Sequence, residues 1–244
     1  MDRLLDRVCL ITGSTGIAAA AALRCASEGA SVFVVSRTRD HACDLVDRVT
    51  AIGGQAAWAV ADLTVETEAN AAVGAALERF GRIDGVFSVA GGSGRGFGDG
   101  PIHELTMDGW DRTLELNLRS QALVARAVTR IMLAQPPTTA GSRGSIVLVS
   151  SVLASRPVPE LFATHAYAAA KGAIVSLATT MAAAYAPAGI RVNTIAPGLT
   201  ATPMAARAAT DPATTEFVRR KQPLVAGFVA AQDIADAALF LLSD

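Results

Sequence analysis

The sequence predicts an α/β fold, with a doubly wound parallel sheet of the Rossmann type and helices on both faces. Short apolar runs of strand length alternate with helical patterns along the chain. Strands of this kind, apolar throughout rather than alternating, are typical of a parallel sheet that is covered on both sides. The 244 residues show no internal repeat, long linker or change of composition. We therefore expect residues 1–244 to form a single domain that both binds its ligand and performs any chemistry.

The predicted elements follow one another in a regular order. Strands are expected at 8–12, 31–36, 56–61, 85–90, 145–150 and 190–196. Helices are expected at 17–27, 39–52, 66–80, 106–134 and 165–186. Right-handed crossovers between such strands produce a doubly wound sheet, which binds its ligands at the carboxyl ends of the strands. The residues that follow each strand are therefore the candidates for a functional site.

The composition excludes several classes of protein. The chain is 51% hydrophobic and 18% charged, which favours a large buried core over disorder. Its formal net charge of −1 gives no basic footprint for nucleic acid. Cys9, Cys25 and Cys43 lack metal-binding spacing and are odd in number, so we interpret them as reduced, buried thiols in a cytoplasmic protein, with no metal site.

Neither the N-terminus nor the longest uncharged stretch of the sequence indicates a targeting or membrane segment. Residues 1–7 carry acids and no apolar run, so they do not resemble a signal peptide. Residues 172–190 carry no charge, but Pro187 and Gly189 interrupt them. A buried helix followed by a turn is the better interpretation of that stretch, and no membrane partner is expected.

The first strand is followed by a glycine turn, whose residues are Gly13, Ser14, Thr15, Gly16 and Ile17. Glycines at this position let the backbone approach a diphosphate, and the N-terminus of the next helix faces its negative charge. A plain strand-to-helix turn is the alternative. The position after the first strand favours a dinucleotide site.

The next two strands end in residues that would meet the adenosine half of a dinucleotide. Ser36 and Arg37 follow the second strand, where an acid would bind a ribose 2′-hydroxyl and an Arg a 2′-phosphate. The acid is missing, so we favour NADP(H) over NAD(H), with an ordinary solvated Arg as the alternative. Asp62 and Leu63 follow the third strand and are placed to meet the adenine; capping of the next helix is the competing explanation for this region.

The fourth strand ends at Ala90 and Gly91, and a glycine-rich run continues to residue 100. We expect a mobile loop on the rim of the site. In the long helix that follows, Asn117 lies on an otherwise apolar stripe. A polar group on an apolar face must find hydrogen-bond partners, so Asn117 is either a site residue or a satisfied core residue.

Three polar residues follow the fifth strand. Ser151 lies at its end, and Tyr167 and Lys171 lie four residues apart, on one face of the next helix. An ammonium near a phenol stabilises the phenolate and lowers the phenol pKa from its ordinary value of about 10, so the Tyr can pass a proton near neutral pH. For the pair alone, a shared face by chance is the alternative. His165 has no obvious acid partner and is interpreted as structural.

The sixth strand ends at Pro197 and Gly198, and Thr202 follows, placed either to bond a carboxamide or to cap a helix. We predict that residues 199–228 form an apolar lid over the substrate, with residues 152–166 as the opposite wall. The apolar side chains expected to contribute to the lid are Leu199, Met204, Phe217, Leu224 and Phe228. A moderately apolar ketone or secondary alcohol suits these walls better than a free sugar.

Taken as a set, these motifs resemble the short-chain dehydrogenase/reductase family over about residues 5–243. The resemblance implies that Tyr167 is the acid/base, that Ser151 orients the substrate oxygen, and that Lys171 lowers the Tyr pKa and bonds the nicotinamide ribose. It also implies that Asn117 holds a water in the proton relay. The remaining matches are the Thr-Gly turn at 12–16, Asp62-Leu63, Ala90-Gly91 and Pro197-Gly198.

The chain departs from the family pattern in three places. Only two residues separate Gly13 from Gly16, and Ala18 stands where a last glycine is usual. Ser88 and Val89 replace the usual Asn-Asn after the fourth strand. Family members continue into a seventh strand beyond the position where this sequence ends.

The leading hypothesis is therefore an NADP(H)-dependent carbonyl reductase. The alternatives are a non-catalytic dinucleotide-binding or sensor protein, a 3-oxoacyl-carrier reductase of the same family and, less well supported, a methyltransferase. We also expect a symmetric homodimer or homotetramer built on the helices at 106–134 and 165–186. The stripe of small residues expected at that interface is Ala166, Ala170, Ala173, Leu177, Thr180 and Ala184.

Overall fold

Six parallel strands form one sheet at the centre of the protein. The structure, a computed structural model, describes residues 2–244; residue 1 of the N-terminal segment 1–7 lies outside the described part. The strand order is β3-β2-β1-β4-β5-β6. The order reverses between β1 and β4, which confirms the doubly wound topology. The strands are β1 (Val8–Thr12), β2 (Ser31–Ser36), β3 (Gln55–Val60), β4 (Gly85–Ser88), β5 (Gly144–Val149) and β6 (Ile190–Ile195).

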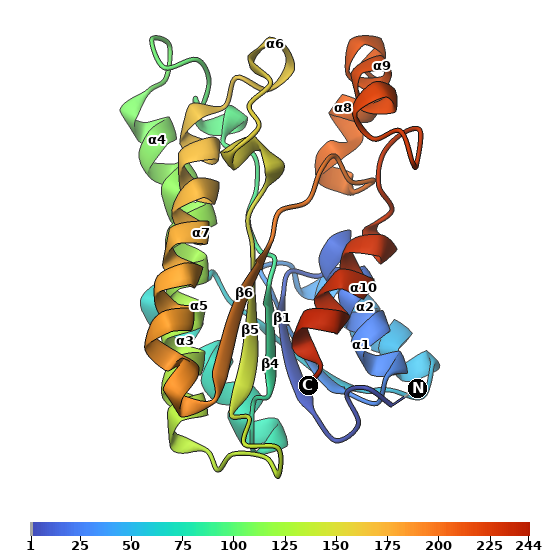
Figure 1. Ribbon diagram of the computed structural model, residues 1–244, viewed down its shortest axis with the longest axis vertical. Coiled ribbons are helices and arrows are strands. Elements are labelled where there is room, and N and C mark those ends of the chain that lie inside the picture. The colour runs from blue at the N-terminus through green and yellow to red at the C-terminus, as the bar shows by residue number, and fades with distance from the viewer. Residues whose placement is uncertain (1) are drawn as a thin grey trace.

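Helices cover both faces of this sheet, as Figure 1 shows. On one face lie α3 (Glu66–Phe80), α5 (Ser120–Ala134) and α7 (His165–Tyr185). On the other lie α1 (Ile17–Ser27), α2 (Arg39–Ala51) and α10 (Ala231–Leu242). Each face of the sheet has its own hydrophobic core. Successive side chains of a strand point to opposite faces, so Leu10 packs in the core beneath α3, α5 and α7, while Cys9 and Ile11 pack in the core beneath α1, α2 and α10.

The predicted end of the fourth strand differs from the observed one because a side chain takes the place of strand pairing. The fourth strand stops at Ser88 rather than at residue 90. The backbone N–H groups of Val89 and Ala90 donate to the hydroxyl oxygen of Thr12, at 2.9 and 3.0 Å, instead of continuing the ladder. This hydroxyl ties the carboxyl ends of β1 and β4 together at the point where the strand order reverses.

The long helix expected at 106–134 is interrupted. It consists of α4 (Met107–Leu114), a π-helical turn (Glu115–Arg119) and α5. Asn117 is fully buried in the π turn. Such turns insert an extra residue into a helix and occur often at functional sites. Apolar periodicity did not reveal the interruption, because both flanking helices keep a helical pattern.

The glycine-rich loop after β4 packs closely against α4 at two of its glycines, and its mobility stays a prediction. A side chain at Gly94 would overlap the hydroxyl of Thr113, and a Cβ at Gly98 would lie 2.5 Å from the Thr106 oxygen. Gly98 also has φ of 101°, in the left-handed region. At both positions glycine allows the loop to lie directly on the helix.

Several short helices were not predicted; all but the 3₁₀ turn Ala186–Ala188, which precedes β6, lie at the carboxyl end of the sheet. They are α6 (Pro159–Phe162), α8 (Ala206–Thr210), α9 (Pro212–Lys221) and 3₁₀ turns at Arg95–Phe97, Val152–Ala154, Ala186–Ala188 and Pro203–Ala205. Figure 1 places α8 and α9 on the opposite side of this end from α4 and α6.

Two further sequence expectations concern the cysteines and the uncharged stretch. Cys9 and Cys25 are free and buried, whereas Cys43 is free but only half-buried, which corrects the expectation for that residue. The uncharged stretch forms most of α7, then a 3₁₀ turn and Gly189, as predicted. Within residues 2–244, no helix has both the length and the hydropathy that crossing a bilayer requires.

Candidate active site

A cavity of about 280 Å³ lies at the carboxyl end of the sheet. Its walls come from the turn after β1, the loops after β4, β5 and β6, the π turn and α7. This is where a doubly wound sheet binds its ligands. The predicted site residues that line it are Thr15, Gly16, Ile17, Gly91, Asn117, Ser151, Tyr167, Lys171, Pro197, Gly198 and Thr202.

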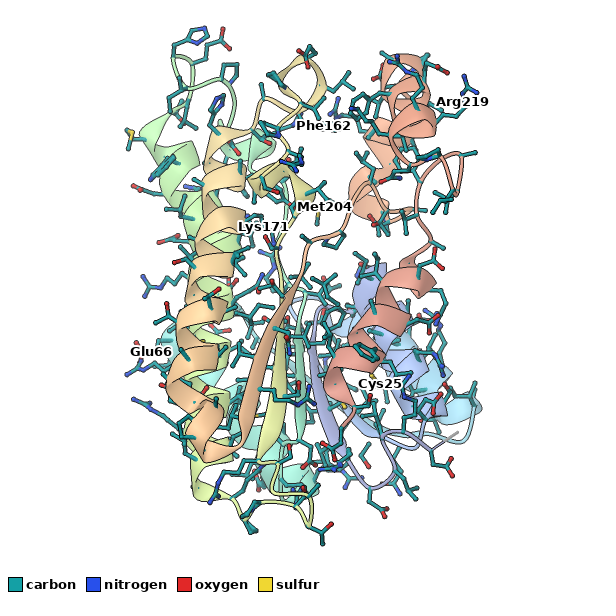
Figure 2. The ribbon with its side chains drawn as sticks, in the orientation of Figure 1. Cys25, Glu66, Phe162, Lys171, Met204 and Arg219 are labelled. Carbon is teal, nitrogen blue, oxygen red and sulfur yellow. The ribbon has the colours of Figure 1, made fainter. Side chains whose placement is uncertain are left out.

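Lys171 is held at the base of this cavity. Its side chain points from α7 towards the sheet (Figure 2), and only 3% of the residue is exposed. Nζ donates a hydrogen bond to the carbonyl oxygen of Val149 at 2.8 Å and lies 5.5 Å from the centre of the Tyr167 ring. Burial lowers the pKa of Lys171 to about 8. The ammonium is therefore fixed between the end of β5 and the phenol.

The Tyr167 phenol lies in the same cavity, beside Ser151. Burial raises the pKa of Tyr167, and a hydrogen bond with the Ser151 hydroxyl acts in the opposite direction. The direction differs from the expected lowering by Lys171. The physical reason is that burial dominates, while the ammonium is directed to the carbonyl group of Val149. The three residues nevertheless converge, as the sequence predicted.

Asn117 braces the loop after β4. Its Nδ2 donates to the carbonyl oxygens of Gly92 at 2.9 Å and Thr113 at 3.0 Å, and its Oδ1 accepts from the Gly92 N–H at 3.1 Å. The side-chain amide is thus satisfied by backbone groups, as a buried polar group must be. It fixes Gly92, which lines the cavity. The water-holding role implied by the family resemblance stays a prediction.

Asp99 is a structural contributor that sequence reasoning missed. It is 6% exposed, and its two carboxylate oxygens accept from the backbone N–H groups of Ala166 at 2.9 Å and Tyr167 at 3.0 Å. A carboxylate is stabilising at a helix N-terminus, where N–H groups lack partners. It fixes the first turn of α7, and Tyr167 with it. Asp99 lies far away in the sequence, so no local motif signals it.

His165 is structural, as expected from its lack of an acid partner. Its backbone N–H and ring Nδ1 lie 3.3 and 2.9 Å from the carbonyl oxygen of Gly100. Together with Asp99, this contact attaches the glycine-rich loop to the start of α7.

The glycine turn adopts a conformation suited to a diphosphate. Gly13 and Gly16 have φ values of 96° and 54°, and α1 begins at Ile17 with no acid in its first turn. A Cβ at Gly16 would lie 3.0 Å from the Thr202 side chain, because the segment after β6 lies against the turn. The start of this 11-residue helix therefore lies at the cavity, with Thr15, Gly16 and Ile17 in its lining and no acid in the first helical turn. These residues fit a dinucleotide.

The predicted adenosine-side residues lie outside this cavity. Ser14 and Ser36 are joined through their hydroxyl oxygens at 2.8 Å, which links the glycine turn to the end of β2. Arg37 is exposed. The other predicted residues that do not line the cavity are Gly13, Asp62, Leu63 and Ala90.

Asp62 and Leu63 have structural roles after β3. One Asp62 oxygen accepts from the backbone N–H of Thr64 at 2.9 Å and from its hydroxyl at 2.7 Å. These bonds, and then the charge of Arg37, lower the pKa of Asp62. Leu63 is 6% exposed and packs in the core beneath α3. The Leu63 side chain is therefore a core residue, not a ligand contact.

The predicted lid is only partly a cavity wall. Leu199 and Met204 line the cavity, but Phe217, Leu224 and Phe228 do not, and Leu224 is 100% exposed. Met204 and Phe162 both line the cavity, on segments from opposite walls, and Figure 2 shows Met204 near the level of Lys171 with Phe162 above it.

Hydrogen bonds join the two ends of the lid segment to each other. Val229 donates to the Leu199 carbonyl oxygen and accepts from the Ala201 N–H, both at 2.9 Å. Gln222 Nε2 donates to the carbonyl oxygens of Leu199 at 3.1 Å and Gly227 at 2.7 Å.

Arg95 and Arg207 also line the cavity and were not predicted. Neither belongs to a motif that the sequence analysis used. Metal ligation receives no support from the described chain, because no three His, Cys, Asp or Glu side chains gather anywhere in residues 2–244.

Comparison with known proteins identifies relatives across the whole chain. The family model described as enoyl-(acyl carrier protein) reductase matches residues 11–244. The chain is 38% identical over 247 residues to the A-factor type gamma-butyrolactone 1′-reductase (1S-forming) of Streptomyces virginiae, which covers 99% of this chain and 90% of the relative.

Two solved structures share the fold. The crystal structure of levodione reductase superimposes with a TM-score of 0.88 at 35% identity, covering 99% of this chain and 92% of that chain. A short-chain type dehydrogenase/reductase from Mycobacterium ulcerans gives a TM-score of 0.88 at 31% identity, covering 99% and 84%.

Proposed function

The chain belongs to the short-chain dehydrogenase/reductase family of oxidoreductases, and on this premise we propose that it is an NADP(H)-dependent enzyme that interconverts a carbonyl and a secondary alcohol on a moderately apolar substrate. One observation carries the proposal. Tyr167, Ser151 and Lys171 converge in a cavity that also contains the glycine turn after β1. A proton donor and a cofactor site thus lie in one cavity.

The residues of the chain would perform the proton chemistry. In reduction, the Tyr167 hydroxyl gives its proton to the substrate oxygen, and in oxidation the phenolate takes that proton back. The Ser151 hydroxyl orients the same oxygen by a hydrogen bond. The Lys171 ammonium lies near the phenol and stabilises its negative charge when the proton leaves. Asn117 keeps the facing loop in place.

A nicotinamide dinucleotide supplies the hydride when it is bound. We propose that the backbone of residues 13–17 binds its diphosphate and that Thr202, Pro197 and Gly198 meet its nicotinamide end. Ser36 and Arg37 would meet the adenosine half, with Asp62 and the backbone around Ala90 and Gly91 beside them. Arg37 is exposed beyond β2 without an acid in its place, which supports a 2′-phosphate and hence NADP(H).

Titration with both reduced cofactors tests the cofactor proposal. We expect NADPH to bind at least about tenfold more tightly than NADH, and Arg37→Gln to remove most of that difference, because a charge-assisted contact with the 2′-phosphate is lost. Arg39→Gln is the matched control. Tighter binding of NADH than of NADPH by the unmodified protein would reject the interpretation of Arg37.

The cavity walls support an apolar substrate. Val152, Leu153, Phe162, Leu199 and Met204 all line it. The Streptomyces virginiae relative and levodione reductase are both named as reductases, which supports reduction as the direction for this chain. A panel of carbonyl compounds with the tighter-binding cofactor is the direct test of activity.

Tyr167→Phe separates an enzyme from a non-catalytic dinucleotide-binding protein. We expect a loss of at least about a thousandfold in turnover with cofactor binding retained, because only the proton-bearing oxygen is removed. Tyr185→Phe, on the same helix, should change turnover little. Equal turnover of Tyr167→Phe and the unmodified protein would remove Tyr167 from the mechanism.

A 3-oxoacyl-carrier reductase is a second candidate within the family. The matching family model is described as an enoyl-(acyl carrier protein) reductase, which supports a carrier-bound acyl substrate but not the oxo group itself. The last turn of α9 carries Arg219, Arg220 and Lys221, which could meet an acidic carrier. Glu216 already forms ion pairs with the two arginines, so the positive charge that this patch offers to a carrier is lower than its three basic residues suggest. Reduction of a carrier-bound oxoacyl group in preference to the free acyl thioester would establish it.

We further propose a cytoplasmic homodimer or homotetramer. The free thiols support the compartment. The small-residue stripe of α7 supports self-association only at its C-terminal end, since Ala166 and Ala170 are buried within the protein's own fold while Thr180 and Ala184 are exposed. Sedimentation that shows only monomer at micromolar concentration would reject the oligomer.

A further inference from the structure

Two arginines line the cavity from opposite walls. Arg95 lies in the 3₁₀ turn Arg95–Phe97 of the loop after β4, and Arg207 lies in α8, in the segment after β6. The fold brings them to one cavity from segments far apart in the sequence. The reaction proposed above uses neither of them.

Arg95 is fixed in the wall at the Phe162 end of the cavity. Its Nη2 donates to the carbonyl oxygen of Leu161 at 2.9 Å, next to Phe162. Burial lowers the pKa of Arg95, and the positive charge of Arg207 lowers it further. Both arginines line the same cavity and are exposed to solvent, so each is accessible to a ligand.

The neighbouring carboxylates do not neutralise these charges fully. The charge of Asp99 partly offsets the lowering of the Arg95 pKa, but both of its carboxylate oxygens accept hydrogen bonds from N–H groups in the first turn of α7. Asp211, near Arg207, accepts from the backbone N–H and the hydroxyl of Thr214. In the part of the chain that the structure describes, neither arginine has a carboxylate oxygen within 4.0 Å.

We infer that the substrate carries a carboxylate, held between Arg95 and Arg207, in addition to the carbonyl or hydroxyl group that reacts at Tyr167 and Ser151. Guanidinium groups are planar donors whose geometry matches a carboxylate, and an anion between two cations relieves their repulsion. The apolar side chains of Phe162 and Met204 also line the cavity and suit the body of such a molecule. The substrate class is thus an oxo acid or hydroxy acid with an apolar body. This inference rests on the proposed function.

Matched pairs of substrates test the inference. Levulinate and its longer homologues are assayed with the preferred cofactor, each beside its methyl ester, which keeps the ketone and removes the charge. We expect the unmodified enzyme to favour at least one acid over its ester by about tenfold or more in kcat/KM, mainly through KM. Arg95→Gln and Arg207→Gln should each reduce that preference several-fold, and the double variant should abolish it.

Arg79→Gln is the matched control, since it removes an exposed arginine from α3, outside the cavity lining. It should leave the acid-to-ester ratio unchanged. Equal kcat/KM for every acid and its ester would overturn the inference while leaving the proposed oxidoreductase function intact. A ratio insensitive to both cavity variants would overturn it as well.

A binding measurement keeps the inference testable if none of these ketones is reduced. The hydroxy acids and their esters are titrated calorimetrically onto the cofactor-loaded protein and its variants. Acid-selective binding that depends on both arginines supports the inference even where the proposed reaction fails. Absence of such selectivity overturns it. Weaker NADPH binding in the arginine variants, with no acid selectivity, would assign these side chains to the cofactor instead.

Discussion

The base and the lid of the cavity are built differently. At the base, Lys171, Asn117 and Ser151 are at most 8% exposed, and their side chains hydrogen-bond to the backbone of the sheet end, the loop after β4 and the 3₁₀ turn after β5. On the lid side, Met204 is 59% exposed and Leu224 is 100% exposed. The two ends of the lid segment are joined to each other by the bridge between Thr200 and Val229 and by the hydrogen bonds of Gln222.

This difference separates two requirements of an enzyme. Proton transfer needs groups held at fixed distances, and buried side chains with satisfied hydrogen bonds provide that. Substrate choice and entry need a surface that can change or move without disturbing the reacting groups. Substitutions at the base should therefore alter stability and kcat, whereas substitutions in the lid should alter KM.

The largest effect is expected from the pH dependence of Lys171. In the unfolded chain a lysine keeps its proton up to its ordinary pKa of 10.5, whereas the folded protein releases the Lys171 proton from about pH 8. The unfolded state thus binds more protons in this window, so this residue's contribution makes the free energy of unfolding rise with pH, by up to about 3 kcal/mol. Lys171→Met should remove that rise.

Urea denaturation at a pH of about 7.5 and about 9.5 measures this difference. Lys221→Met, at an exposed position of α9, should keep the same pH dependence as the unmodified protein. An unchanged pH dependence in Lys171→Met would show that the ammonium is not held in a buried environment.

Asn117→Ala should cost about 2 kcal/mol of stability and reduce kcat. The substitution leaves the N–H and carbonyl groups of Gly92 without their partner, and unsatisfied buried groups are costly. Thermal denaturation and steady-state kinetics measure the two effects. Asn70→Ala, at an exposed position of α3, should change neither. A stable variant with normal kcat would refute the bracing role of Asn117.

Asp99→Asn should cost about 1 kcal/mol and lower kcat several-fold at temperatures where the variant is fully folded. An amide can accept only through one oxygen, so one of the N–H groups of Ala166 and Tyr167 loses its acceptor and the favourable charge is removed. Cofactor affinity should stay unchanged, which distinguishes displacement of Tyr167 from general disruption. Asp111→Asn, on the exposed side of α4, is the control.

The smallest stability effect is expected in the lid. Gln222→Ala removes the side chain that joins Leu199 to Gly227, and should cost less than about 1 kcal/mol. We expect KM to rise several-fold with kcat nearly unchanged, as measured by substrate titration. Gln232→Ala, on α10, is the control. A fall in kcat equal to that of the base variants would remove the distinction between base and lid.

The sheet and the reacting residues could be predicted because they depend on local patterns. Apolar runs give the strands, and the spacing of Tyr167 and Lys171 places both on one helix face. The roles of Asp99, Arg95 and Arg207 could not be predicted, since each depends on a contact with a distant segment. The close packing of Gly94 and Gly98 against α4 could not be predicted either, since it depends on contacts with Thr113 and Thr106.

The π turn sets the rotational phase between α4 and α5. An α-helix advances by about 100° per residue, so an insertion or deletion there changes the direction in which one helix faces relative to the other. Shortening 115–119 by one residue would swing Thr113 and Gly109 away from the glycine-rich loop on which they now rest. That loop carries Asp99, which accepts a hydrogen bond from the backbone N–H of Tyr167. Such a one-residue change would therefore also alter the orientation of Tyr167.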